Sequence, residues 1–190
     1  HLRIQSCSGG GGRVDLGILR RTDEVWTSDN TDALDRLSIQ YGYGQIYPAV
    51  TMAAWVTDVP NQQTGRTVPL RFRFHVAMAG ALAIGSDLPQ WTEEELAEAA
   101  QFVAQYKRIR PIVQHGRLHR LLPPGSDRLS ASQYVAPDGS ESAVFYWLPA
   151  PHFGRAVGPV RLRGLDPAAR YRDAATGEVH HGAVLLGHGL

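Results

Sequence analysis

The sequence predicts an α/β protein built from half of a TIM-type (β/α)8 barrel, followed by a small antiparallel β domain. Up to Gly116 one pattern occurs four times: a short apolar stretch, a small polar or acidic residue at its end, and then an amphipathic helix. Strands that alternate with helices are typical of parallel βα units. After Gly116 the pattern changes to short β-rich segments separated by turns.

Four apolar stretches are the expected parallel strands. Chemistry in (β/α)8 barrels lies at the C-terminal ends of the strands, so the residue that ends each stretch is expected to face a site. Four units supply only half a barrel and leave two long strand edges without partners. We therefore expect the other half on a longer chain or on a partner. The stretches are residues 2–6 before Cys7, 24–28 before Asp29, 52–57 before Asp58 and 81–86 before Asp87.

Capping and apolar periodicity predict three amphipathic helices. The second begins with Pro69 and stops at Gly80, the usual asymmetry of helix ends. The third opens with Thr92 and carries Glu95 three residues later, which is a capping box. The expected helices are residues 31–43, 69–80 and 92–113.

The last third of the chain predicts a small antiparallel β-sandwich domain. A linker at residues 123–125 precedes it, and Asp138-Gly139 between two strands is a strong hairpin signal. We expect the barrel half at residues 1–120 and the β domain at residues 121–190. The expected strands are residues 130–135, 142–148, 159–165, 170–173 and 179–186.

Composition excludes some classes of protein. The hydrophobic fraction of 43% is enough to bury a core. Net charge is +1 and the basic residues are scattered, so no nucleic-acid partner is expected. No apolar run reaches the roughly 18 residues of a spanning helix, so no membrane partner is expected either. Cys7 is the one cysteine, which favours a reducing compartment and a cytoplasmic location.

Asp29 is the leading catalytic candidate among the strand-end residues. A glycosidase needs two carboxyl groups around the scissile bond, and one of them must hold a proton. Trp26 as an apolar neighbour and Asp32 as a second carboxylate would both favour that proton on Asp29. The Trp26 ring could also stack on a sugar. The alternative is that Asp29 caps the helix that begins near Asp32, and spacing alone favours the cap.

The loop after Cys7 holds four glycines, which permits close approach of its backbone to another group. One interpretation of the loop is phosphate binding, but the Lys of a P-loop does not follow it. Another is that Cys7 is a nucleophile, but no activating His lies nearby in the sequence. The residues alone favour a flexible βα loop with a buried thiol.

The remaining candidates have simpler structural explanations. His115 and His119 are spaced for a metal pair, but no third ligand is evident. Asp58 and Asp87 either face the site or cap the helices that follow. The stretch of residues 71–73 reads as a helix with one solvated face.

Two linked motifs give the sequence a family resemblance. Cys-Ser-Gly-Gly-Gly-Gly-Arg at residues 7–13 and Trp-Thr-Ser-Asp-Asn-Thr-Asp-Ala at residues 26–33 resemble glycoside hydrolase family 36, the α-galactosidases related to melibiase and raffinase. Shorter matches continue in order, including Pro60-Asn61 and residues 64–66. The resemblance covers nearly the whole chain and is looser in the β domain.

The resemblance implies a retaining α-galactosidase that acts on oligosaccharides such as melibiose and raffinose through a galactosyl-enzyme intermediate. It implies that Asp29 is the general acid/base and that Cys7 and Gly10 line the sugar subsite around the 2-hydroxyl. No metal or organic cofactor is required. Gln5 stands where the family usually has Glu, and we assign it no role.

The family's nucleophile is an Asp in a Lys-Trp-Asp strand end, one strand before Cys7, and this sequence contains no such motif. The chain is thus expected to carry barrel strands five to eight, to lack the nucleophile, and to be inactive without the N-terminal half of the barrel. The full enzyme is expected to be a homo-oligomer, with a tetramer possible. The alternatives are an α-N-acetylgalactosaminidase, a raffinose-type galactosyl transferase, or an inactive sugar-binding half-barrel.

Overall fold

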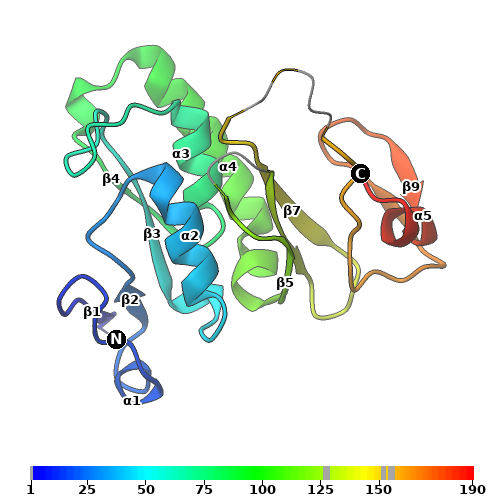
Figure 1. Ribbon diagram of the computed structural model, residues 1–190, viewed down its shortest axis with the longest axis horizontal. Coiled ribbons are helices and arrows are strands. Elements are labelled where there is room, and N and C mark those ends of the chain that lie inside the picture. Colours follow the sequence, from blue (N-terminus) through cyan, green and yellow to red (C-terminus); the bar gives the residue numbers. More distant parts are fainter. Residues whose placement is uncertain (1, 126–128, 151–152, 154–156) are drawn as a thin grey trace. The chain divides into compact units, whose positions relative to one another are not determined.

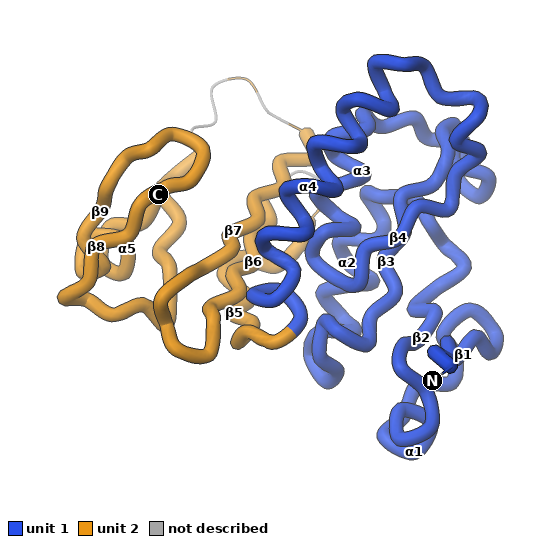
Figure 2. The backbone as a smooth tube through the Cα atoms, turned by 180° about the vertical axis from the view of Figure 1, so that it is seen from behind, with its two compact units in different colours: residues 1–114 blue, residues 115–190 orange. Residues whose placement is uncertain are grey.

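The computed structural model describes residues 2–125, 129–150, 153 and 157–190 of the chain. Backbone contacts divide it into two compact units, residues 1–114 and residues 115–190. Figure 1 shows the elements and Figure 2 the two units. The elements of the first unit are β1 Gln5–Ser6, α1 Leu16–Leu19, β2 Glu24–Trp26, α2 Ala33–Tyr43, η1 Ala49–Thr51, β3 Met52–Thr57, α3 Leu70–Ala77, β4 Ala81–Gly85, η2 Leu88–Gln90 and α4 Glu93–His115. Those of the second are β5 Arg117–Leu122, β6 Ser130–Val135, β7 Ser142–Trp147, β8 Arg170–Arg172, β9 Val179–His181 and α5 Gly182–Gly187.

The first unit contains one parallel sheet with the strand order β1-β2-β3-β4. All four predicted strands are present and all pair in parallel, which confirms the βα pattern. β3 has the predicted bounds, whereas β1 is only two residues long. The sheet is open, with β1 and β4 at its edges.

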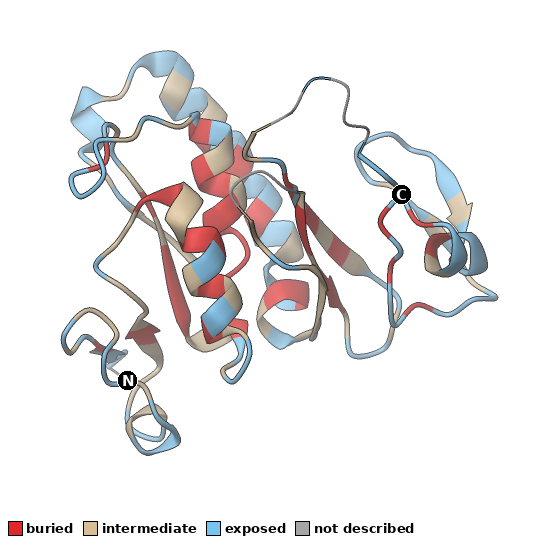
Figure 3. Ribbon diagram, viewed as in Figure 1, coloured by how far each residue is buried: buried red, intermediate tan, exposed pale blue. Residues whose placement is uncertain are grey.

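The strand register gives the sheet two different faces. Val25 lies opposite Met52 and Trp26 opposite Ala53, so alternate side chains point to opposite sides. On one face, Val25 and Met52 are buried and cluster with Tyr43 at the end of α2. Figure 3 shows buried residues along β3 and on α2. The other face carries Trp26 and Trp55, both half-buried.

The three predicted helices are present as α2, α3 and α4, although α3 ends at Ala77 and α1 was not predicted. Thr92 and Glu95 form the expected capping box, with reciprocal hydrogen bonds of 3.0 and 3.2 Å. α4 runs through Pro111 to His115, two residues beyond its predicted end. The Tyr106 hydroxyl of α4 donates to the Gly80 carbonyl at 2.7 Å, which ties this helix to the start of β4. None of the described helices is both long and apolar enough to cross a membrane.

The second unit contains the antiparallel sheet β5-β6-β7 and the two-stranded ribbon β8-β9. β6 and β7 occupy the predicted positions. The turn between them contains Gly139 at φ 74°, as the Asp-Gly hairpin signal predicts. β5 was not predicted as a strand, and the expected domain boundary after residue 120 falls inside it.

One predicted strand of the second unit is wrong, and another is correct only in its first three residues. Residues 159–165 form no strand, although the Val160 backbone bonds to Leu190 and the Leu162 amide donates to the Leu185 carbonyl. Their partners are the chain end and a helix, so no continuous ladder forms. Residues 179–186 split into β9 and α5. A side chain at Gly182 would collide with the Asp166 carbonyl, and the helix places Leu185 in a buried cluster with Leu162.

Candidate active site

Asp29 lies just beyond β2, at the C-terminal edge of the parallel sheet, with its side chain exposed. The indole N–H of Trp26 donates to its Oδ1 at 2.8 Å. The Gln63 side-chain amide donates to its backbone carbonyl at 2.8 Å. Trp26 was expected as an apolar neighbour, but it meets the carboxyl group through its polar N–H. The carboxyl group and the backbone of Asp29 are therefore both held in place.

The glycine loop lies directly against Asp29. Gly10 has a φ of 60°, and a Cβ atom on it would lie 2.5 Å from Oδ2 of Asp29. A Cβ atom on Gly11 would collide with the backbone carbonyl of Thr27. Only residues without a side chain fit these two positions. The loop thus packs on the turn after β2, and that contact explains why Gly10 and Gly11 are glycines.

Cys7 is unpaired and exposed, so the expectation of a buried thiol is wrong. It lies just beyond β1, which is a two-residue strand at the edge of the sheet. The structure therefore brings Gly10, Trp26 and Asp29 together and places Cys7 at the start of the same glycine loop.

Asp32, and not Asp29, is the N-cap of α2. Its Oδ1 accepts hydrogen bonds from the amides of Leu34 at 2.8 Å and Asp35 at 3.2 Å. Arg66 donates to the same oxygen at 2.5 Å, and the Thr64 hydroxyl donates to Oδ2 at 2.5 Å. The alternative that Asp29 caps this helix is therefore wrong. Asp32 was also expected to favour a proton on Asp29, but its carboxylate is occupied by the helix and by Arg66.

Asp32 is 2% exposed, and its environment favours the charged form. Burial by itself raises the pKa of Asp32, but the hydrogen bonds from Thr64, Arg66 and the two amides outweigh burial and leave the pKa below its ordinary value. Stability from this group is present above the ordinary carboxyl pKa and is lost as the pH falls through the lowered folded-state pKa.

We expect Asp32→Asn to lower the free energy of unfolding by about 1–3 kcal/mol at neutral pH, because the charged hydrogen bonds are lost. The difference from the parent chain should shrink below about pH 4. Urea unfolding of the 190-residue chain at several pH values measures this. Asp35→Asn is the matched control, since Asp35 is half-exposed and should cost less. An Asp32 effect that is independent of pH would contradict the assignment.

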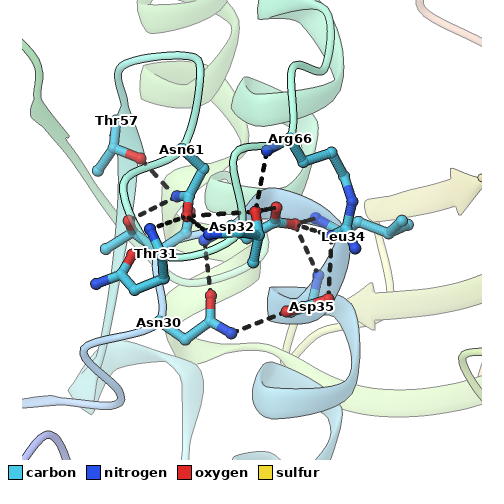
Figure 4. A network of polar contacts seen from close by, with 10 residues as sticks. Asn30, Thr31, Asp32, Leu34, Asp35, Thr57, Asn61 and Arg66 are labelled. Atoms are coloured by element: carbon cyan, nitrogen blue, oxygen red, sulfur yellow. Dashed lines mark hydrogen bonds and ion pairs between the residues drawn. The ribbon is translucent and has the colours of Figure 1, made fainter.

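The end of β3 and the loop after it bond to Thr31, Asp32 and Asp35, in the segment that follows Asp29 (Figure 4). The Asn61 side-chain amide donates to the Thr31 hydroxyl at 3.1 Å, and Thr57 donates to the Thr31 carbonyl at 3.4 Å. Arg66 adds a bond to Asp35 at 3.1 Å. Sequence reasoning assigned no role to Asn61, Gln63 or Arg66. The sequence feature that could have indicated them is the group of amide side chains and one arginine in the loop after β3.

Arg36 of α2 is another contributor that the sequence did not reveal. It is 2% exposed, and its guanidinium donates to the Ala53 carbonyl at 2.5 Å and more weakly to the Ser28 carbonyl at 3.5 Å. Burial lowers its pKa to about 10. This side chain joins the residue before Asp29 to β3.

The stretch of residues 71–73 lies in α3 as expected, with Arg71 exposed, but Arg73 is buried. It is 6% exposed, it donates to the Thr57 carbonyl at 2.8 Å, and its guanidinium lies 5.9 Å from the centre of the Trp91 ring. Burial lowers its pKa despite nearby carboxylates. The physical reason is that its long apolar stem can be buried with the helix while its head reaches a strand-end carbonyl.

Asp58 and Asp87 contact each other at the ends of β3 and β4. Oδ2 of Asp58 accepts from the Asp87 amide at 3.1 Å, and Oδ1 accepts from the Trp91 indole at 3.3 Å. Neither side chain caps a helix: α3 begins after Pro69, and Asp87 makes no cap hydrogen bond to η2. The Asp87 carboxylate accepts from the Gln90 side-chain amide at 2.6 Å. The printed hydrogen-bond partners of the two carboxylates thus lie around the ends of β3 and β4, and Asp29 is not among them.

The histidine pair has no further ligand in the part of the chain that the structure describes, where no three His, Cys, Asp or Glu side chains gather in a metal-binding group. His119 lies in β5, and its Nε2 is buried without a hydrogen-bond partner among the described residues. Burial, with Arg117 and Arg163 nearby, lowers the pKa of His119. These contacts favour a neutral structural histidine.

Comparison with known proteins identifies the family. The family model described as Melibiase matches residues 1–116, and the glycosyl hydrolase family 36 C-terminal domain matches residues 129–190. Alpha-galactosidase C of Emericella nidulans is 41% identical over 98% of this chain and 24% of its own length. Alpha-galactosidase AgaA of Geobacillus stearothermophilus is 42% identical over 100% of this chain and 26% of its own length.

Solved structures agree with the sequence comparison. The crystal structure of a doubly substituted AgaA in complex with raffinose superposes with a TM-score of 0.93 and 41% identity, covering 98% of this chain and 26% of that one. This chain spans about a quarter of the length of the curated relatives it matches. It has an α/β fold that matches family 36 α-galactosidase structures. The chain belongs to the melibiase family, glycosyl hydrolase family 36.

Proposed function

We propose that this chain supplies the general acid/base half of a retaining α-galactosidase site, and that Asp29 is the acid/base. One observation carries the proposal: an exposed carboxyl group at the C-terminal edge of the sheet is oriented by Trp26 and flanked by Gly10. The α-galactosidase names of the relatives support the reaction type. The proposed substrates are oligosaccharides with a terminal α-linked galactose, such as melibiose and raffinose.

In the first step of the proposed mechanism, Asp29 protonates the glycosidic oxygen while a second carboxylate attacks the anomeric carbon. This forms a galactosyl-enzyme and releases the aglycone. In the second step the ionised Asp29 removes a proton from water, which attacks the anomeric carbon and releases galactose. The Trp26 N–H occupies Oδ1, so Oδ2, on the side of Gly10, is the oxygen proposed to exchange the proton.

The proposed sugar subsite is the glycine loop. Gly10 would leave room for the galactose ring beside Oδ2, and Cys7 at the start of the loop would contact the ring near its 2-hydroxyl. Trp26 would bound the same space with its half-buried ring. A free 2-hydroxyl suits this small loop better than a 2-acetamido group. Assays on matched galactose and N-acetylgalactosamine glycosides separate these substrates, and melibiose with and without sucrose separates hydrolysis from transfer.

The second carboxylate is proposed to lie outside these 190 residues, on the N-terminal half of the barrel. The two open strands β1 and β4 would be the places where the remaining strands pair, with the present strands as five to eight. Retention requires the two carboxyl groups to lie roughly 5–5.5 Å apart.

We therefore expect the purified 190-residue chain to show no turnover of a nitrophenyl α-galactoside, and the full-length enzyme to hydrolyse it. The reason is that an acid/base without a nucleophile cannot form the intermediate. Release of nitrophenol by each preparation measures this. Turnover by the chain alone would contradict the split of the carboxylate pair, and a full-length enzyme without α-galactosidase activity would contradict the function.

A further inference from the structure

Three groups from three adjacent strands form a line that ends on Asp29. The Trp26 indole of β2 holds the Asp29 carboxyl group at 2.8 Å. The Trp55 ring of β3 packs edge-on against the Trp26 ring, with centroids 4.7 Å apart and an interplanar angle of 74°. A Cβ atom on Gly85 of β4 would collide with the Trp55 ring.

The strand register explains why these residues share one face. Trp26 lies opposite Ala53, and Trp55 follows two residues later on the same side of β3. Trp55 in turn lies opposite Ala83, and Gly85 follows two residues later on β4. The residues opposite the two indoles, Ala53 and Ala83, have small side chains and leave space on this face for the rings. The line from Gly85 to Asp29 is thus built into the sheet.

The packing lets Trp55 hold the Trp26 indole in one orientation. Trp26 is only half-buried, so its hydrogen bond to Asp29 requires a support that keeps the indole in one rotamer. An edge-to-face partner provides that support, because it favours one relative orientation of the two rings. A displaced indole would release Oδ1 and let the carboxyl group turn, and small misplacements of a catalytic group are costly.

We propose that Trp55 is a positioning residue for the acid/base Asp29, that it acts through Trp26, and that Gly85 is required because it leaves the space for the Trp55 ring. This inference rests on the proposed function of Asp29. It adds Trp55 of β3 and Gly85 of β4, which act on Asp29 only through the Trp26 indole.

The test uses the full-length enzyme and two substrates. Melibiose has a poor leaving group that needs the proton of the acid/base, whereas a dinitrophenyl α-galactoside leaves with little need for it. The value of kcat/KM reports the first, bond-breaking step for both. We expect Trp55→Leu to lower kcat/KM for melibiose about tenfold or more, and to change that for the dinitrophenyl galactoside less than about threefold.

Two further variants make the chain of contacts testable. Trp55→Phe keeps an aromatic edge against Trp26 and should restore most of the melibiose activity. Gly85→Ala should displace the Trp55 ring and reproduce the substrate selectivity of Trp55→Leu. In the double variant, Gly85→Ala should add little to Trp55→Leu, because both act through one contact. Trp91→Phe, which instead loses a bond to Asp58, is the matched control and should leave the ratio of the two substrates unchanged.

Equal losses on both substrates would overturn the inference, since a general structural role has no reason to discriminate between leaving groups. Fully additive effects of Gly85→Ala and Trp55→Leu would overturn it as well. Thermal unfolding identifies variants that fail to fold, and if Trp55→Leu is one of them, Trp55→Phe and Gly85→Ala decide. Asp29→Asn is run in parallel. If Asp29→Asn loses the same activity on both substrates, the proposed function fails. If Asp29→Asn loses more activity on melibiose but the Trp55 variants do not, only this inference is overturned.

Discussion

Replacing Asp29 by asparagine in the full-length enzyme should lower kcat for melibiose by about 10²- to 10⁴-fold. Asparagine keeps the size of the side chain and can still meet Trp26, but it cannot donate and then recover a proton. The protein should fold normally, because Asp29 is exposed and α2 is capped by Asp32. Initial rates with melibiose, together with thermal unfolding, measure both parts.

The neighbouring strand ends supply the control for this experiment. Asp58→Asn and Asp87→Asn also neutralise exposed carboxyl groups at the same edge of the sheet. The Asp58 carboxylate accepts from the Asp87 amide and the Trp91 indole, and the Asp87 carboxylate accepts from the Gln90 side chain. Neither carboxylate bonds to Asp29, so we expect less than about a tenfold loss of activity. A loss from Asp29→Asn no larger than theirs would remove Asp29 from the acid/base role.

Gly10→Ala should lower activity on melibiose by about 10²-fold, because its methyl group would press on Oδ2 of Asp29 and fill the space proposed for the sugar ring. The positive φ of 60° adds a backbone strain of roughly 1–2 kcal/mol for any L residue. Rates and thermal unfolding of the full-length variant measure the two effects separately.

Gly9→Ala is a matched control for the strain. Gly9 has a φ of 59°, nearly the same as Gly10, but a Cβ atom on it would have nothing within 4 Å. The two variants should therefore lose similar stability, while only Gly10→Ala loses activity strongly. Equal losses of activity would mean that the loop's backbone, and not its contact with Asp29, is what matters.

The parallel sheet could be predicted from the sequence because local and long-range signals agree there. β3 is a run of apolar residues that ends at an aspartate, and the capping box of Thr92 fixes the start of α4. The second unit was harder, since the short apolar run around Leu185 fits a strand and a helix equally well. In the structure the chain turns into α5 at Gly182, where the backbone lies too close to the Asp166 carbonyl for a side chain to fit.

The main residues of the site could be predicted from the sequence, but the residues that hold them in place could not. Asp29 and the glycine loop are visible as motifs, yet two aspartates three residues apart offer the same cap signal, and only geometry assigns it to Asp32. The burial of Arg36 and Arg73 could not be predicted for a different reason. Periodicity treats every charged residue as solvent-facing, whereas both of these guanidiniums are buried against backbone carbonyls.

The most direct test of the central claim is the anomeric configuration of the product that the Asp29→Ala enzyme forms with azide. Without the carboxylate, azide can enter and attack the anomeric carbon of the galactosyl-enzyme, displacing the nucleophilic carboxylate. Two inversions then give α-galactosyl azide, together with a recovery of rate on an activated substrate. Nuclear magnetic resonance of the product distinguishes the outcomes: α-galactosyl azide is the predicted result, and β-galactosyl azide would make Asp29 the nucleophile and contradict the account.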